Sequence, residues 1–248
     1  AYLRIAEGCS NRCTYCAIPC IRGKFQSRRL EDVLIEANKL VEAGYKELIV
    51  IAQDTSKYGI DIYGEPKLAE LLERLSKIEG VKWIKFLYTY PESITDELIK
   101  VVKENDKICK YFDIPVQHIS NSVLKRMNRK SNGQSIRKVI AKIRKEIPEV
   151  IIRTTVMVGF PGETKEDFEE LYQFVEETKF DRLGAFAYSK EDGTPASRIK
   201  QQVHHKTKQA RLDKIMSLEQ QISRIKLEEK IGQEYEAVVD GFSEDNRF

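Results

Sequence analysis

Apolar positions along the chain follow two periods in turn. Short β-branched runs are separated by longer segments in which apolar residues recur at helical spacing, and the alternation repeats about six times. This pattern is typical of βα units and a parallel sheet. The expected strands cover residues 2–6, 47–52, 83–88, 111–116, 151–160 and 182–188. We therefore expect an α/β fold, a partial (open) βα barrel of about six parallel strands with helices outside.

The expected helices are amphipathic. Apolar residues follow the i, i+3, i+4 spacing after Val33 and again after Leu68. Thr95 and Thr164 stand where N-caps would, and Thr164 with Asp167 reads as a capping box. The run 48–51 is apolar without alternation, which predicts a strand covered on both faces.

A long helix is expected over 205–230, followed by a strand-like segment over 234–239. One strand cannot make a domain, so the chain is expected to stop just inside a further module. The pattern predicts one catalytic domain over residues 1–231, and the start of a truncated C-terminal β module over 232–248.

Composition changes the picture in two respects. Charged residues reach 33%, and no stretch approaches the length of an uncharged membrane helix, so a membrane protein is excluded. The opening residues AYLRIAEGCS lack the segments of a signal peptide, and a cytoplasmic location follows. The five cysteines are an odd number with three of them crowded together, which favours reduced thiols or metal ligands over a disulfide framework.

Charge is unevenly distributed, although the net charge is only +3. Residues 1–30 carry six basic side chains against Glu7, and residues 121–145 carry nine with no acid. Residues 160–180 hold seven acids against two lysines. Such blocks are usually solvated helix faces, and a basic face for a phosphate-rich partner stays open as the alternative.

The most informative group of potential metal ligands is a CxxxCxxC run directly after the first expected strand, formed by Cys9, Cys13 and Cys16. Three thiolates on one loop can converge on a metal centre. Zinc requires a fourth ligand, and only Cys20 is near in sequence. A four-iron, four-sulfur cluster on three cysteines leaves one iron without a protein ligand, where a substrate can bind.

This run, with Tyr15 just before its last cysteine and at the head of a βα barrel, resembles the radical S-adenosylmethionine enzymes. The resemblance implies a 4Fe-4S cluster on Cys9, Cys13 and Cys16, with S-adenosylmethionine chelated at the open iron. One electron then cleaves S-adenosylmethionine to a 5′-deoxyadenosyl radical. In such an enzyme the cofactor supplies the chemistry, and the protein supplies positioning and exclusion of water.

Three narrower blocks are similar to the methylthiotransferases: EGCSNRCTYCAIPCIRG from Glu7, IPVQH from Ile114 and VGFPGET from Val158. AQDTSKYG from Ala52 and DRLGAFAYSKEDGTPA from Asp181 resemble the branch that modifies the β-carbon of an aspartate in a small-subunit ribosomal protein. The alternative is the branch that modifies an adenosine of transfer RNA. The family implies an electron donor as a partner, and a second 4Fe-4S cluster in an N-terminal domain.

Polar residues near the carboxyl ends of the expected strands are the candidates to bind the cofactor, because a βα barrel builds its active site there. These are Gln53, Gln117, Arg153 and Thr155, together with Tyr15 from the cysteine run. Each has a structural alternative. Gln53 could cap a loop, Thr155 could simply suit a strand, and Arg153 could pair with Asp113 or Asp54. No proton-transfer residue is identified, and His118 is interpreted as a supporting residue.

An enzyme is not the only function class open to this sequence. A module that uses the cluster for electron transfer alone would carry the same cysteines. VGFPGET lacks the lysine of a phosphate-binding loop, so hydrolysis of nucleoside triphosphates is not supported.

Overall fold

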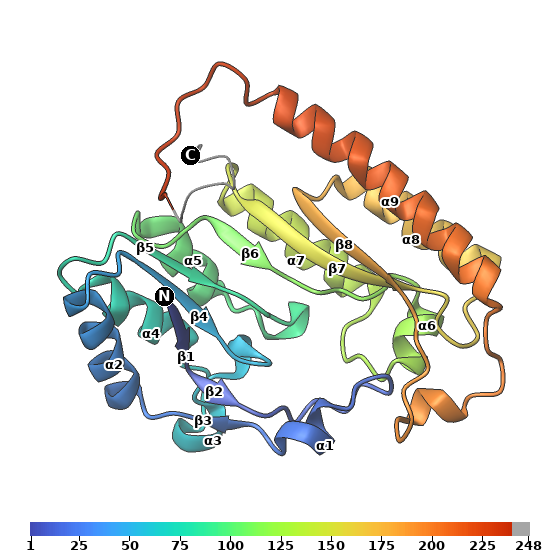
Figure 1. Ribbon diagram of the computed structural model, residues 1–248, viewed down its shortest axis with the longest axis horizontal. Helices are drawn as coiled ribbons and strands as arrows, with labels where there is room; N and C mark the ends of the chain where they lie inside the picture. Colours follow the sequence, from blue (N-terminus) through green and yellow to red (C-terminus); the bar gives the residue numbers. More distant parts are fainter. Residues whose placement is uncertain (240–248) are drawn as a thin grey trace, which may run out of the picture.

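The computed structural model describes residues 1–239. Within them, parallel strands form two three-stranded sheets, ordered β1-β4-β5 and β6-β7-β8 (Figure 1). These strands are β1 (Tyr2–Arg4), β4 (Glu47–Ile51), β5 (Trp83–Phe86), β6 (Tyr111–Asp113), β7 (Ile151–Val158) and β8 (Arg182–Ala187). The α/β class and the parallel strands are confirmed. A small antiparallel pair, β2 (Ala6–Glu7) and β3 (Gln26–Ser27), was not expected.

The two parallel sheets meet between β5 and β6. Ile84 forms an isolated parallel bridge with Ile108, and the Cys109 amide donates to the Ile84 carbonyl at 2.9 Å. Strand β6 ends at Asp113, three residues before its expected end. Ile108 lies before β6, so β5 and β6 share no ladder, and one isolated bridge joins the two three-stranded sheets.

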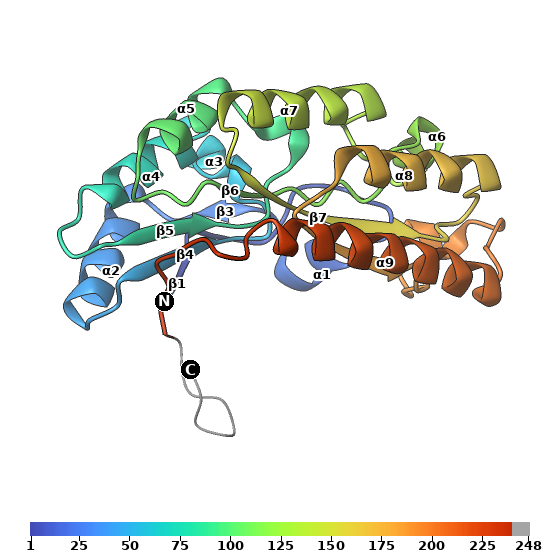
Figure 2. The same ribbon diagram turned by 90° about the horizontal axis from the view of Figure 1, so that it is seen from above.

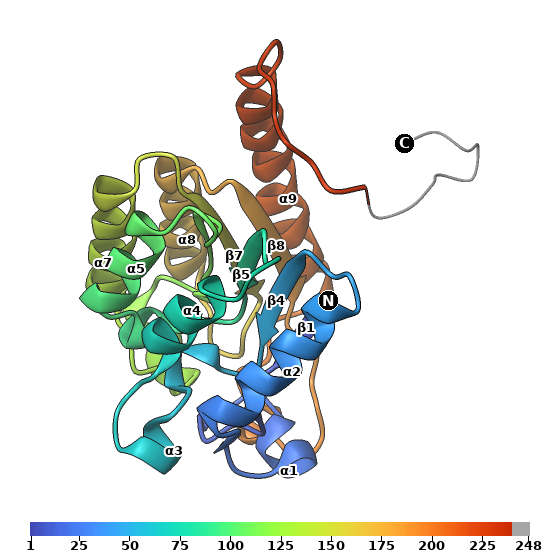
Figure 3. The same cartoon turned by 90° about the vertical axis from the view of Figure 1, so that its left-hand side faces the viewer.

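Most of the helices form an outer layer on one side of the strands, whereas the last one, α9 (His205–Glu228), runs along the edge strand β8 (Figures 2 and 3). The longer ones are α2 (Leu30–Glu42), α4 (Leu68–Ser76), α5 (Asp96–Glu104), α7 (Gly133–Glu146), α8 (Lys165–Thr178) and α9. The shorter ones are α1 (Ile18–Arg22), α3 (Ile60–Tyr63), α6 (Asn121–Arg126) and the 3₁₀ turns η1 (Thr55–Lys57), η2 (Pro91–Ser93) and η3 (Pro195–Arg198). None of the helices in this part of the chain is long and apolar enough to cross a membrane.

The two helix N-caps that the sequence predicts are present. The Thr95 hydroxyl accepts from the Leu98 amide, and Thr164 and Asp167 form the expected capping box at α8. Such a cap typically stabilises a helix by about 1 kcal/mol. Helix α9 packs along β8 at the edge of the second sheet.

Burial alternates along the strands. In β4, Leu48 and Val50 are fully buried against the helices, whereas Ile49 and Ile51 are half-buried. The expectation that this strand is covered on both faces is therefore wrong for its second face. We call this less buried face, opposite the one that packs on the helices, the concave face; in β7 the alternation of burial places Arg153 and Thr155 on the less buried face as well.

The expected strand over residues 234–239 is not formed. The segment that follows α9 has no regular secondary structure up to residue 239. Lys82 and Glu236 form an ion pair there. The rest of the expected C-terminal module, residues 240–248, lies outside the described residues.

Candidate active site

The cysteine run lies in the loop between β2 and α1. Cys9 and Cys13 are buried, Cys16 is half-buried, and Cys20, on α1, is exposed. Burial raises the pKa of the Cys9 and Cys16 thiols, and the nearby Cys13 adds to the rise at both. Cys9, Cys13 and Cys16 therefore form a compact group of free thiols, and Cys20 points away into solvent.

Hydrogen bonds from distant parts of the chain fix this loop. The Thr14 amide donates to the Met127 carbonyl at 3.0 Å, and the Thr14 hydroxyl donates to the Arg126 carbonyl at 2.8 Å. The Ala196 amide donates to the Thr14 carbonyl at 2.9 Å. The loop is thus attached both to the end of α6 and to η3.

Gly8 allows the loop to begin. Its φ of +74° lies in the left-handed region, and a Cβ there would be 2.3 Å from the Lys24 carbonyl oxygen. Only glycine permits this approach of two backbone segments. The amide of Cys9, the next residue, donates to the Gly23 carbonyl at 3.1 Å and closes the loop.

The donor set fits a cluster better than a single ion. Over residues 1–239 no group of three or more His, Cys, Asp or Glu side chains is arranged to hold one metal ion. A four-iron cluster binds each thiolate to a different iron, so its cysteines need not converge on a point. Three free thiols on one loop, two of them buried and one half-buried, with the fourth exposed, fit a cluster that leaves one iron open.

Tyr15 and the turn over residues 159–163 (GFPGE), here called the GFPGE turn, form one side of the site. The Tyr15 ring packs edge-on against Phe160 with centroids 6.4 Å apart, and burial raises its pKa. The Phe160 ring in turn packs edge-on against the Tyr188 ring, with the ring centroids 5.3 Å apart. Tyr15 is thereby fixed between the cysteine loop and the end of β7.

Gln53 and Gln117 lie where the resemblance places them, beyond the carboxyl ends of β4 and β6. The Gln53 Oε1 atom is buried and accepts no hydrogen bond from any residue that the structure describes. Gln117 has φ +68° and bridges to Val156, because its amide donates to Thr155 and its carbonyl accepts from Met157. A buried amide oxygen without a donor is a place for a ligand to bind.

Arg153 is exposed in β7, in register with Asp113 and Arg182. The guanidinium forms no ion pair within the described chain. Burial raises the pKa of Asp113, and Arg153 acts in the opposite direction. Asp54 is engaged elsewhere, because it accepts from Asn11 at 2.8 Å and Ser56 at 2.5 Å. The expected alternative of pairing with Asp54 is therefore wrong, whereas Arg153 lies opposite Asp113 and acts on its charge, so the Asp113 alternative stays open.

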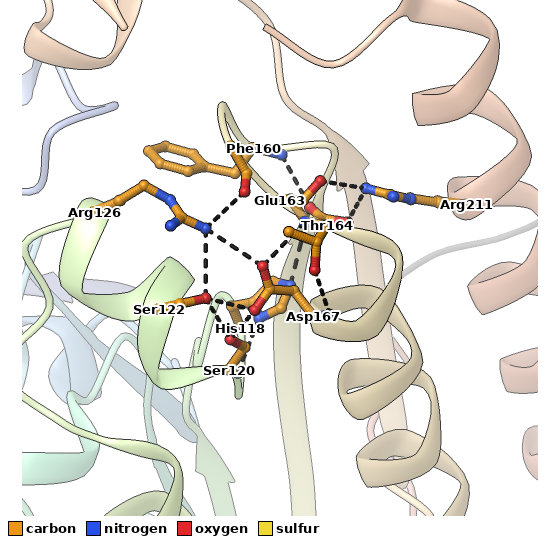
Figure 4. Close-up of polar contacts among 10 residues, drawn as sticks. His118, Ser120, Ser122, Arg126, Phe160, Glu163, Thr164, Asp167 and Arg211 are labelled. Carbon is orange, nitrogen blue, oxygen red and sulfur yellow. Dashed lines mark hydrogen bonds and ion pairs between the residues drawn. The ribbon is translucent and has the colours of Figure 1, made fainter. Parts of the chain in front are cut away.

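A polar network joins the GFPGE turn to α6, α8 and α9 (Figure 4). Glu163 accepts from the Phe160 amide at 3.0 Å and from Arg211 at 2.8 Å. Asp167 accepts from Ser120, Ser122 and the Thr164 amide. Burial opposes ionisation of Asp167, but these hydrogen bonds prevail and lower its pKa to about 2.

His118 lies at the centre of this network and is fully buried. Its Nδ1 accepts from the Ser120 amide at 3.0 Å, and its Nε2 is 4.0 Å from Glu163. Burial lowers its pKa to about 3, so the ring is neutral at physiological pH. One nitrogen of this neutral ring is thus bonded, whereas Nε2 is buried without a hydrogen-bond partner in residues 1–239, and the supporting role of His118 stays a prediction.

Comparison with known proteins decides between an iron–sulfur cluster and a single metal ion on these cysteines. The profile of the radical SAM superfamily matches residues 3–175, which carry the three cysteines and most of the strands. The chain belongs to the radical SAM superfamily. Membership confirms the predicted cofactors of this site, a 4Fe-4S cluster and S-adenosylmethionine, and makes the protein an enzyme of that class.

Curated relatives show which members of the superfamily this chain is similar to in sequence. The chain is 68% identical over 97% of its length to "Ribosomal protein uS12 methylthiotransferase RimO" of Alkaliphilus oremlandii. It is 56% identical over 99% of its length to the protein of the same name from Clostridioides difficile. The chain covers 55% of each of these relatives, so it spans about half their length. The resemblance to the methylthiotransferases is confirmed.

Solved structures share the fold. The radical S-adenosylmethionine methyltransferase TsrM from Kitasatospora setae superposes with a TM-score of 0.64 at 14% identity, over 79% of this chain and 38% of that one. Coproporphyrinogen III oxidase (HemN) from Escherichia coli gives 0.63 at 18% identity, over 89% and 52%. The α/β partial barrel of the radical SAM fold is therefore confirmed for this chain.

Two residues of this radical SAM site were missed by sequence reasoning. Asn11 donates to Asp54 across the site, and it accepts from Lys57. Arg129 is buried beside the cysteine loop, stacked 4.2 Å over the Tyr90 ring. Arg129 belongs to the basic block 121–145, and nothing in the sequence separates it from the exposed cations around it.

Proposed function

We propose that the chain is the catalytic part of a methylthiotransferase that adds a methylthio group to the β-carbon of an aspartate in ribosomal protein uS12, a protein of the small subunit. The observation that carries the proposal is the 68% identity, over nearly the whole chain, to a relative bearing that name. The proposal includes an electron donor, a cytoplasmic location and a second cluster in an N-terminal domain. It divides the chain at residue 231, with a β module beginning at 232.

In this proposal Cys9, Cys13 and Cys16 hold the cluster. When bound, the cluster and S-adenosylmethionine supply a strongly oxidising carbon radical from one electron. Tyr15, Gln53, Gln117, Thr155 and Arg153 bind and orient S-adenosylmethionine. They come from the cysteine loop, from the segments that follow β4 and β6, and from within β7, so six strands act together as one half-barrel around the ligand.

Individual atoms support these roles. The buried Gln53 Oε1 lacks a donor that an amino or hydroxyl group could supply. Arg153 is an exposed cation in β7, suited to a carboxylate. The backbone of Gln117 is held in the left-handed region by two hydrogen bonds, which fixes where its side chain begins.

Ion pairs between the basic block 121–145 and acidic side chains favour an aspartate over a nucleotide as the acceptor. Arg137 of the basic block pairs with Glu177 of the acidic block at 3.0 Å, and Arg126 pairs with Asp167 at 3.4 Å. Lys142 pairs with Asp96. Cations that pair with carboxylates offer less of the continuous basic face that a phosphate backbone requires.

Mass spectrometry of both substrates tests the proposal. The full-length protein, with its clusters reconstituted, is given uS12 and transfer RNA under anaerobic conditions with S-adenosylmethionine and a reductant. We expect a methylthio mass on one aspartate of uS12 and unmodified transfer RNA. A mark on adenosine with none on uS12 would establish the transfer RNA enzyme instead.

A further inference from the structure

Arg129 is a buried cation that is not paired directly with any carboxylate of residues 1–239. Only 9% of its surface is exposed, and it forms no ion pair in the described part of the chain. One of its terminal nitrogens donates to the Pro115 carbonyl at 3.0 Å, whereas its Nε is buried without any partner. Burying a charge is costly unless an opposite charge compensates it.

The Glu92 carboxylate raises the pKa of Arg129 but forms no ion pair with it. Glu92 lines the same small cavity of about 180 Å³ as Arg129, but its Oε2 accepts from the Ser131 hydroxyl. Tyr90 covers one face of the guanidinium with its ring 4.2 Å away. The remaining neighbours of Arg129 are Tyr15 and Cys13, which also lines the cavity.

Backbone hydrogen bonds at the end of α6 position Arg129 near Cys13. Helix α6 ends in a Schellman motif, in which the Arg129 amide donates to the Leu124 carbonyl at 2.9 Å and the Asn128 amide to Lys125 at 3.0 Å. Asn128, at φ +55°, supplies the left-handed residue that this motif needs. Its side chain donates to the Arg12 carbonyl at 2.8 Å.

The same helix end holds the loop itself. Thr14, next to Cys13, uses the free carbonyls of Arg126 and Met127. The position of Arg129 relative to Cys13 is thus set by backbone hydrogen bonds on both sides, and it does not depend on a flexible side chain reaching across solvent.

We propose that Arg129 is the counter-charge of the cluster held by Cys9, Cys13 and Cys16, and that it raises the reduction potential of that cluster. Three thiolates give an oxidised four-iron cluster a net negative charge, and reduction adds one more. A fixed buried cation stabilises the reduced form more than the oxidised form. The electron comes from a one-electron donor, the cluster is reduced, and Arg129 stays protonated without any bond changing. The inference rests on the cluster and not on the acceptor substrate.

A redox titration of the 248-residue chain with reconstituted cluster tests this. The cluster is poised with dithionite and mediators and followed by its electron paramagnetic resonance signal. In Arg129→Gln we expect the ratio of reduced to oxidised cluster at a given potential to fall about tenfold, a midpoint about 59 mV more negative for a one-electron couple. Arg129→Lys keeps the charge and should stay close to the wild-type midpoint.

Lys130→Gln is the matched control. Lys130 lines the same cavity, but it is exposed, so water screens its charge and the midpoint should hardly move. Iron content is measured for every variant. Loss of iron in Arg129→Gln but not in Arg129→Lys would also support a charge requirement. An unchanged midpoint in Arg129→Gln, or equal defects in Gln and Lys variants, would overturn the proposal in favour of a packing role.

Discussion

At the scale of single residues, the site is marked by polar atoms that are buried and unsatisfied within the described chain. Gln53 Oε1 and Arg129 Nε both belong to this set. Folding does not benefit from leaving such atoms without partners, since each costs about 1–3 kcal/mol. Both adjoin the place where the cysteines and strand ends meet, which is why we relate them to bound cofactors.

Gln53→Ala should weaken the binding of S-adenosylmethionine about tenfold, because one hydrogen bond to the ligand is lost. The free energy of unfolding should hardly fall, since the side-chain oxygen has no donor within residues 1–239. Isothermal titration of the reconstituted protein gives the affinity. Gln202→Ala is the control, because Gln202 bonds only to the backbone of Ala196 and Ile199 and should leave the affinity unchanged. Equal affinities for Gln53→Ala and wild type would remove Gln53 from the ligand site.

His118 predicts a pH dependence of stability. Burial lowers its pKa to about 3, whereas the unfolded chain binds the proton near pH 6.5. The unfolded state therefore holds more protons between these values, and stability is lost as pH falls through this window. From pH 7.5 to 5.5 the free energy of unfolding should fall by about 1 kcal/mol more in wild type than in His118→Gln. Urea unfolding at both pH values measures the difference, and identical pH slopes would contradict the burial of a neutral ring.

At the scale of elements, the sequence predicted the helices and caps well, because local signals determine them. Thr95, Thr164 and Asp167 bond to backbone groups within three residues. The division of the strands at β6, and the missing strand over 234–239, could not be predicted, since both depend on a partner strand elsewhere. The same holds for Asn11 and Arg129, whose roles come from contacts 43 and more than 100 residues away along the chain.

The β2–α1 loop gives a prediction with a matched control. Gly8 and Gly23 have the same left-handed φ, +74° and +75°, but only Gly8 is pressed against backbone. Gly23→Ala should cost about 1–3 kcal/mol from the dihedral angles alone and still bind iron. Gly8→Ala must also displace Lys24, so it should lose most of its iron on reconstitution. Iron analysis and thermal unfolding compare the two, and equal iron content would show that the backbone approach is not required.

At the scale of the whole molecule, the fold brings distant segments to one side of the strands. The cysteine loop follows the first strands, the end of α6 and η3 fix it, and β4, β6 and β7 supply the polar residues. Helices cover the opposite face (Figure 2). The sequence could predict this arrangement in outline, because parallel βα units place their carboxyl ends together. It could not predict which side chains on the concave face remain free.

Cleavage of S-adenosylmethionine by this chain tests the central claim most directly. The 248-residue protein is reconstituted with iron and sulfide, given S-adenosylmethionine and dithionite, and assayed for 5′-deoxyadenosine. The account predicts that wild type and Cys109→Ala form the product, and that alanine at Cys9, Cys13 or Cys16 abolishes both iron binding and product. A wild-type chain that binds its cluster yet forms no 5′-deoxyadenosine would contradict the account and leave an electron-transfer module in its place.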